Sequence, residues 1–287
     1  MYSFKNAHPF VILMYFVFVI GFSCFIMHPV CLAVSAISAL LFSVMLNGSK
    51  GIKRRLMYIA VLMILTAIIN PAFNHSGVTI ITYFPNGNPL TYESIVYGIA
   101  ASVMITSVVL WFSCLNNIMT SDKIMYLFGK ILPSFSLIIS MTLRFVPKFI
   151  KQLTQTINAQ KCIGHDISCG NIIKRAKGGI TVLSAMITRS LENSIDTADS
   201  MKSRGYGLSG RTSFSLFVFC KRDKIMLFSI ILMAMYILFG AASGKMYCRY
   251  FPSISMAYSS SYEFSYYLIY FILCALPIIS ELVEEIT

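Results

Sequence analysis

The sequence predicts an all-α integral membrane protein with about six transmembrane helices and a pair of long amphipathic helices. Hydrophobic residues make up 57% of the 287 positions and charged residues only 12%, with a mean hydropathy of +0.74. Soluble domains carry about 25% charged residues, so this composition indicates a membrane protein. Apolar runs near the roughly 20 residues needed to cross a bilayer recur at both ends of the chain. Between them, in residues 116–224, apolar positions follow a helical period instead of forming continuous runs.

The first two spans are predicted at residues 9–27 and 29–46, with a tight turn at His28 and Pro29. Lys5 is the only charge before the first run and no small-residue cleavage site follows it, so we expect a retained span rather than a signal peptide. The loop after the second span carries four cations and no acid, which by the positive-inside rule places this loop and the N-terminus in the cytoplasm. These cations are Lys50, Lys53, Arg54 and Arg55.

A third span is predicted at residues 56–70 and a fourth at 94–112. The connecting segment, residues 71–93, has no Lys or Arg and is rich in Asn, Gly and Pro, so we expect it to lie outside the cell. Trp111 falls at the cytoplasmic end of the fourth span, where it is expected to act as an interfacial anchor.

Residues 116–224 are expected to form a cytoplasmic-side domain, because 16 of the 23 Lys and Arg fall here. Its apolar positions predict two antiparallel amphipathic helices, one running from about Leu143 to Gly164 and one from Asn171 to Arg204. The apolar stripes are Leu143, Val146, Ile150, Leu153 and Ile157 on the first helix, and Leu191, Ile195, Ala198 and Met201 on the second.

The second helix is expected to close at Ser203, Arg204 and Gly205. A glycine there adopts the positive φ of a helix C-cap, and a cation is favourable at the negative end of the helix dipole. Two further spans, at residues 225–243 and 264–279, return the C-terminus to the cytoplasm. The chain is therefore divided into N-terminal transmembrane helices (1–115), the amphipathic pair (116–224) and C-terminal transmembrane helices (225–287).

Several kinds of chemistry were weighed against this pattern. There is no P-loop and no His-Glu-x-x-His, so the chain is not expected to bind ATP or a catalytic metal by itself. Cys162, His165 and Cys169 do not match a common zinc spacing, and the eight cysteines show no disulfide framework. Three alternatives remain. The cationic face of the first amphipathic helix (Arg144, Lys148 and Lys151) could bind anionic lipid, or the chain could be a self-sufficient secondary transporter or a membrane-embedded enzyme. The enzyme would use Glu192, Asp196 and Asp199 as acids or metal ligands.

Three stretches resemble the transmembrane T component of energy-coupling factor transporters (EcfT, related to CbiQ). Asn-Pro-Ala-Phe at 70–73, with the segment that follows, is similar to the family's third span and outer loop. Leu-Arg-Phe-Val-Pro at 143–147 is similar to the start of its long coupling helix. DSMKSRGYG at 199–207 is similar to its second Ala-Arg-Gly motif.

The resemblance implies that the amphipathic helices are coupling helices whose tips dock on two cytoplasmic ATPases. Arg204 matches the motif arginine, Gly205 matches its glycine, and Ser203 stands where alanine is usual. The first motif departs from the pattern, since Cys162, Ile163 and Gly164 replace Ala-Arg-Gly and only Lys161 lies near enough to supply the charge. We therefore expect Ile163 to dock by apolar contact on one ATPase and Arg204 to pair with an acid on the other.

The resemblance also implies a non-enzymatic scaffold in the cell membrane. It would couple ATP hydrolysis on the partner ATPases, which hold ATP and magnesium, to a membrane S component that imports a vitamin or a transition-metal ion. The apolar stripes of the two helices, including Ala198, would contact the S component. No cofactor on this chain and no nucleic-acid partner are expected.

Overall fold

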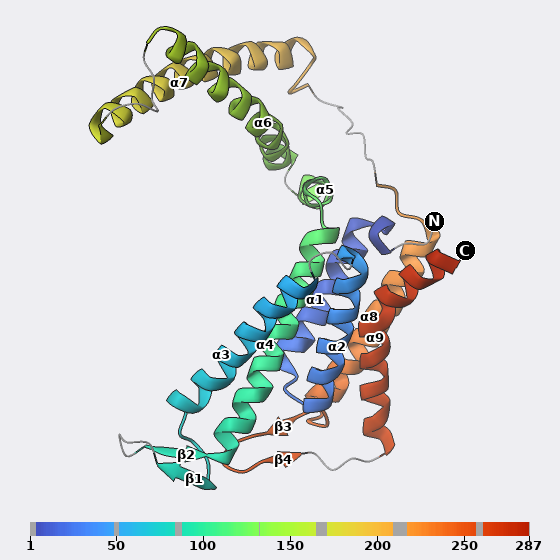
Figure 1. The fold of residues 1–287 in the computed structure, drawn as a ribbon. Coiled ribbons are helices and arrows are strands. Elements are labelled where there is room, and N and C mark those ends of the chain that lie inside the picture. Colours follow the sequence, from blue (N-terminus) through green and yellow to red (C-terminus); the bar gives the residue numbers. More distant parts are fainter. Residues whose placement is uncertain are drawn as a thin grey trace. The chain divides into compact units, whose positions relative to one another are not determined.

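The structure is a computed structural model that describes residues 4–48, 52–83, 88–131, 133–164, 171–208, 217–256 and 261–286. The chain forms two compact units, one built from Met1–Ile124 with Phe217–Thr287 and the other from Met125–Leu216. Regular structure is almost entirely helical (Figure 1), which confirms the predicted all-α class.

The first unit is a bundle of long helices: α1 (Pro9–Phe25), α2 (Pro29–Asn47), α3 (Ile52–Phe73), α4 (Tyr92–Ile118), α8 (Lys221–Ala242) and α9 (Ser261–Ile286). A short 3-10 turn, Phe4–Asn6, precedes α1. Helix α4 packs against α1, α2 and α3, while α9 packs against α2 and α8. The N- and C-terminal helices predicted as separate segments thus share one bundle. Both chain ends lie at one end of it, and the two β-hairpins lie at the other (Figure 1).

Four of the described helices are long and apolar enough to cross a membrane. These candidate spans are Pro29–Leu46, Tyr92–Ile118, Lys221–Ala242 and Glu263–Val283. The apolar helices Pro9–Phe25 and Met57–Phe73 are shorter, and 17 residues of α-helix extend about 25 Å. Together they match the six predicted spans in position. The third ends later than predicted, because α3 continues through Pro71 to Phe73.

Local signals in the sequence explain where the helices begin. Pro9 and Pro29 occupy the first turns of α1 and α2, where proline's missing N–H and fixed φ cost nothing. At the start of α8, the Asp223 carboxylate accepts the backbone N–H of Cys220 (3.1 Å) and that of His8 (3.4 Å). The buried Asp223 therefore caps its own helix and ties it to the start of α1.

Aromatic and hydroxyl side chains fill the centre of the bundle. Trp111 of α4 is fully buried and donates its indole N–H to Ser35 Oγ of α2 (3.0 Å). Ser35 Oγ lies 2.7 Å from Ser23 Oγ of α1, which lies 3.3 Å from the Tyr270 hydroxyl of α9. The expectation that Trp111 is an interfacial anchor is therefore wrong, because its ring lies inside the bundle.

Two small antiparallel hairpins connect the spans. Strands β1 (Ile80–Tyr83) and β2 (Pro89–Thr91) pair within the segment that was predicted to be a loop, and β3 (Cys248–Arg249) pairs with β4 (Ser255–Met256). The Glu93 carboxylate in the first turn of α4 accepts the Thr79 hydroxyl (2.7 Å) and the Thr79 backbone N–H (3.3 Å). This carboxylate therefore fixes the first hairpin to the start of α4.

The second unit contains α6 (Pro133–Cys162) and α7 (Ile172–Ser203), and α5 (Ser121–Ile131) runs across the division between the units. Helices α6 and α7 pack against each other and cross (Figure 1). Among the residues of this unit whose side-chain burial the structure describes, which leaves out 130–136 and 174, Val182 is the one buried hydrophobic side chain. The crossing pair therefore has very little core of its own.

Candidate functional site

Helix α7 is bounded by strong capping signals at both ends. The Asn171 side chain accepts the Ile172 backbone N–H (2.8 Å) at its start. At its end, the N–H of Gly205 bonds to the carbonyl of Lys202 (2.9 Å) and that of Tyr206 to the carbonyl of Met201 (3.1 Å). With Gly205 at φ +79°, this is a Schellman motif. The predicted helix, Asn171 to Arg204, agrees with the structure to within one residue at each end.

Helix α6 ends at a glycine with the same φ region and the first of these two hydrogen bonds, and the residue that would donate the second lies outside the described part. The N–H of Gly164 bonds to the carbonyl of Lys161 (3.0 Å), and Gly164 has φ +85°. The glycine N–H of each tip thus bonds to the carbonyl of the lysine three residues before it. The two tips, Lys161–Cys162–Ile163–Gly164 and Lys202–Ser203–Arg204–Gly205, therefore correspond position by position.

The tips differ in the side chain that precedes the glycine. Ile163 is 71% exposed on the α6 tip, whereas the equivalent position on the α7 tip is the exposed Arg204. Ser203 stands where the resemblance implies an alanine, and its hydroxyl donates back to the Asp199 carbonyl of its own helix (2.8 Å). The serine thus keeps its hydroxyl within α7, and the chemical difference between the tips is isoleucine against arginine.

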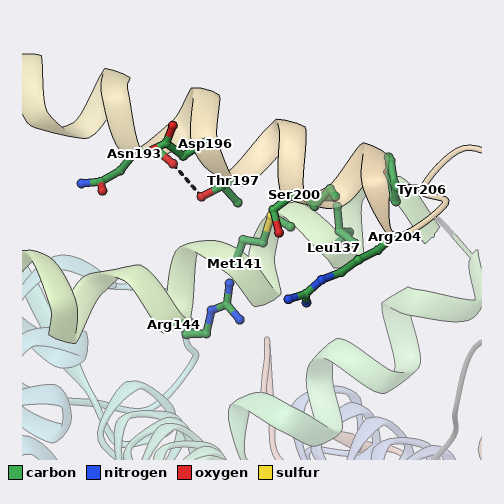
Figure 2. Close-up of a pocket in the computed structure, with 10 residues that line it drawn as sticks. Leu137, Met141, Arg144, Asn193, Asp196, Thr197, Ser200, Arg204 and Tyr206 are labelled. Carbon is green, nitrogen blue, oxygen red and sulfur yellow. Dashed lines mark hydrogen bonds between the residues drawn. The ribbon is translucent and has the colours of Figure 1, made fainter.

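A cavity of about 490 Å³ lies between α6 and α7 beside the α7 tip. Helix α6 lines it with Leu137, Met141 and Arg144, and its α7 wall includes Asp196 and Arg204. Figure 2 shows Arg144 extending from α6 toward α7 and Arg204 extending from the end of α7 toward α6. Thus the guanidinium groups of two arginines that lie 60 residues apart in the chain border one space.

Neither arginine forms an ion pair with any residue that the structure describes. The Arg144 guanidinium lies 5.6 Å from the centre of the Phe145 ring, and Lys148 Nζ lies 5.8 Å from the same ring. Asp196 borders the cavity, but it is not within ion-pair distance of either arginine. The charge at this end of the helix pair is therefore predominantly positive and available to an anion.

The apolar stripes predicted as contact surface lie largely uncovered on the second unit. Exposed fractions are 61% at Ile150, 61% at Leu191 and 64% at Ile195. The other predicted contact residues are exposed or half-buried: Leu143, Val146, Leu153, Ile157 and Ala198. Exposed apolar surface of this extent is typical of a site that contacts another protein or the membrane.

The alternative chemistries find little support in the part of the chain that the structure describes. No group of three potential metal ligands occurs among the described residues. Of the Cys162, His165 and Cys169 motif, only Cys162 lies in the described part. Glu192, Asp196 and Asp199 are all exposed, and of the three only Asp196 lines the cavity. An acid cluster of the kind that the enzyme hypothesis needs is therefore not assembled there.

Sequence reasoning placed Arg204 at the end of its helix but did not associate Arg144 with it. Arg144 was assigned only to the cationic face of the first amphipathic helix, since a helical period shows which residues share a face but not which helix crosses there. The weak sequence signal was the Leu-Arg-Phe-Val-Pro stretch that contains it.

Comparison with known proteins gives one family model, CbiQ (cobalt transport protein), that matches residues 3–214. The energy-coupling factor transporter transmembrane protein EcfT of Lactobacillus helveticus is 40% identical over 99 residues, covering 34% of this chain and 36% of that protein. EcfT of Lactococcus lactis subsp. cremoris is 38% identical over 98 residues, covering 34% of this chain and 37% of that protein. EcfT of Acidaminococcus fermentans is 31% identical over 160 residues, covering 52% of this chain and 59% of that protein. The chain thus matches between about a third and three fifths of the length of these curated relatives.

Proposed function

The chain belongs to the CbiQ family of transport proteins, and on that premise we propose that it is the transmembrane scaffold of an energy-coupling factor importer. In this role the chain joins two cytoplasmic ATPases to a substrate-binding S component in the cell membrane. It is a membrane component of a transporter and not itself the ATPase. ATP and magnesium are held by the partner subunits, and no cofactor is needed on this chain.

The observation that carries the proposal is the pair of equivalent helix tips. Two tips of the same backbone geometry suit two related docking partners, one for each ATPase. Arg204 supplies a planar fork that forms bidentate, charge-assisted bonds to a carboxylate. Ile163, at the equivalent position, supplies apolar contact instead. We propose that each tip enters a groove on one ATPase and that the two grooves are engaged by different chemistry.

The exposed apolar stripes supply the surface for the S component. Leu191 and Ile195 on α7, together with Ile150 on α6, expose more than half of their side chains in the second unit. Covering apolar surface contributes about 25 cal/mol per Å², so burying several such residues provides substantial affinity. Nucleotide-driven movement of the ATPases then reaches the S component through the same two helices. The substrate, a vitamin or a transition-metal ion, is selected by the S component.

A self-sufficient secondary transporter is the less favoured function. Such carriers place unpaired ionisable residues along a substrate path near the bilayer centre. In the described spans, the buried acids Glu93, Asp223 and Glu263 lie in the first turns of their helices. Glu93 accepts the backbone N–H of Thr79 before the first hairpin and Asp223 accepts that of Cys220, which gives both acids a structural role.

Both chain ends are proposed to face the cytoplasm. The cation-rich loop between α2 and α3 lies on the same side under the positive-inside rule, and the first hairpin then faces outward.

The test of the scaffold is co-purification of the tagged chain from its native membrane in mild detergent. Wild type is compared with Arg204→Glu and with a matched charge reversal elsewhere on α7, Arg189→Glu. We expect two ATPases and a small apolar membrane protein to accompany the wild type and the control, and Arg204→Glu to lose or loosen the ATPases. A wild-type chain that purifies alone and moves a solute in liposomes without ATP would refute the scaffold in favour of a carrier.

The difference between the tips has its own test. If Ile163 docks by apolar contact, Ile163→Asp weakens the binding of one ATPase. Arg204→Ala weakens the binding of the other and so impairs transport. Unchanged binding of both ATPases in Ile163→Asp would contradict apolar docking at that tip. Unchanged transport in Arg204→Ala would contradict the role of the charged tip.

A further inference from the structure

The cavity beside the α7 tip contains a charge arrangement that the tip alone does not explain. Arg204 reaches it from the C-terminal cap of α7, and Arg144 reaches it from the middle of α6 (Figure 2). Two like charges that border one space repel each other, and the described residues include no ion-pair partner for either. An anion between them relieves that repulsion.

We propose that Arg144 and Arg204 together form a two-arginine site for one carboxylate of an ATPase subunit. This proposal rests on the proposed function, because it assigns to the cavity the acidic side chain that the α7 tip is proposed to meet. The guanidinium groups offer planar donor forks that match the two oxygens of a carboxylate. A single Glu or Asp side chain can accept from both arginines at once, since an ionised carboxylate offers about four lone-pair positions.

The remaining lining includes the polar α7 residues Asn193, Asp196, Thr197 and Ser200, and its apolar part favours a protein side chain over a free inorganic anion. Leu137 and Met141 of α6 and Met201 of α7 make part of the wall apolar, which suits the hydrocarbon stem of an acidic residue and an apolar neighbour. The cavity also adjoins Tyr206, directly beyond the Gly205 cap. A segment that docks on the α7 tip can therefore reach into the cavity without rearrangement of the cap.

A shared carboxylate would connect two helices that hold each other weakly. Val182 is the one buried apolar side chain among the residues of the second unit whose burial is described, so that part of the α6–α7 crossing has little internal packing to fix it. An acid bonded to both arginines fastens α6 to α7 beside the docking tip. Movement of the ATPase is then passed to both helices together rather than to α7 alone, and Arg144 acts as a second ATPase-contact residue.

The test measures binding of the ATPase subunits, recovered from the wild-type complex, to the full-length chain in lipid nanodiscs. The variants are Arg144→Gln, Arg204→Gln, the double variant, and Arg144→Lys. Controls are Lys148→Gln and Lys151→Gln, which remove cations of α6 that do not line the cavity. We expect each arginine-to-glutamine change to weaken binding about tenfold or more, Arg144→Lys to weaken it less, and the controls to stay within about twofold.

The double variant decides whether the two arginines share a ligand. If they do, its loss of affinity is clearly smaller than the product of the single losses, because removing either arginine already breaks the site. A multiplicative loss would mean separate ligands and would overturn the shared site. If Arg144→Gln fails to fold, Arg144→Lys decides, because it keeps the charge and loses only the planar fork: binding equal to wild type then overturns the proposal.

Two further outcomes separate the rival explanations. Wild-type affinity in Arg144→Gln, with a large loss in Arg204→Gln, would overturn the two-arginine site and leave the scaffold function standing. A loss in Arg144→Gln that occurs only in nanodiscs containing phosphatidylglycerol, and not in phosphatidylcholine alone, would assign the cavity to a lipid headgroup and overturn the proposal. Failure of any ATPase to bind the wild-type chain would instead refute the proposed function itself.

Discussion

Replacing Ser35 by alanine tests whether the hydroxyl network at the centre of the bundle holds its helices together. Ser35 Oγ accepts the indole N–H of Trp111 at 3.0 Å and lies 2.7 Å from Ser23 Oγ. In Ser35→Ala the fully buried indole loses this acceptor, and leaving a buried donor unsatisfied costs about 1–3 kcal/mol. Hydrogen bonds between membrane helices average about 0.6 kcal/mol, with a maximum near 1.7. We therefore expect a loss of about 1–2 kcal/mol.

Thermal unfolding in detergent, followed with a thiol-reactive dye, measures this loss. The dye reports unfolding because Cys31, Cys114 and Cys274 are buried in the folded bundle. The expected change corresponds to a fall in Tm of roughly 2–8 °C by the scaling of soluble domains. Ser107→Ala is the matched control: Ser107 is fully buried, but its hydroxyl bonds only to the Met104 carbonyl of its own helix.

The result that would refute the reasoning comes from a double-mutant cycle. In a Trp111→Phe background there is no indole N–H to leave unsatisfied, so Ser35→Ala should cost less by about 1 kcal/mol. An equal cost in both backgrounds would show that the Ser35–Trp111 bond contributes nothing. A loss in Ser107→Ala as large as that in Ser35→Ala would show that the effect is removal of any buried hydroxyl.

Three further changes test other parts of the molecule. Gly205→Ala forces a side chain into φ +79°, which costs about 1–2 kcal/mol, so ATPase binding should weaken roughly 5- to 30-fold. Gly164→Ala should have the same effect at the other tip. Unchanged binding in both variants would show that docking does not depend on the backbone geometry of the tips. Glu93→Ala removes the acceptor of the Thr79 hydroxyl and N–H, so hydrogen exchange at Thr79 should accelerate, with a smaller effect in Glu93→Gln; equal rates in wild type and Glu93→Ala would contradict this attachment of the hairpin. Burial lowers the pKa of His28 despite the opposing charge of Glu263, so the folded bundle favours the neutral ring. The stabilising contribution of the neutral ring is complete above about pH 6.5 and is lost as the pH falls through the lower folded pKa. Tm should therefore drop more between pH 7.5 and 5.5 in wild type than in His28→Gln.

The ends of α7 and the C-terminal end of α6 were the features most readily predicted from sequence, whereas the predicted start of α6 at about Leu143 is wrong, because the helix begins at Pro133. Asn171 and Gly205 bound α7 because an Asn side chain accepts an orphan N–H and glycine adopts positive φ at no steric cost. These signals act within a few residues, so they can be recognised from the sequence alone. The same holds for the α6 tip, where Gly164 ends the helix as expected.

Features that depend on packing between helices were not predictable. Trp111 was misplaced because the fourth span is apolar on all sides, and its composition does not distinguish the face that meets α2 from the face that meets lipid. The cavity shared by Arg144 and Arg204 depends on where α6 and α7 cross, which no local pattern specifies. The first hairpin was read as a loop because its turn-forming residues outweigh two very short strands.

The scarcity of buried residues in the second unit bears on how the cell handles this chain. Where side-chain burial is described in this helix pair, Val182 is the one buried apolar residue. Such a pair gains stability from whatever covers it, because binding to the folded form stabilises it by mass action. Copies made in excess of their partners would leave α6 and α7 open to chaperones and proteases. The number of assembled transporters would then be set by the scarcest partner, and surplus scaffold would be removed by degradation that begins in this helix pair.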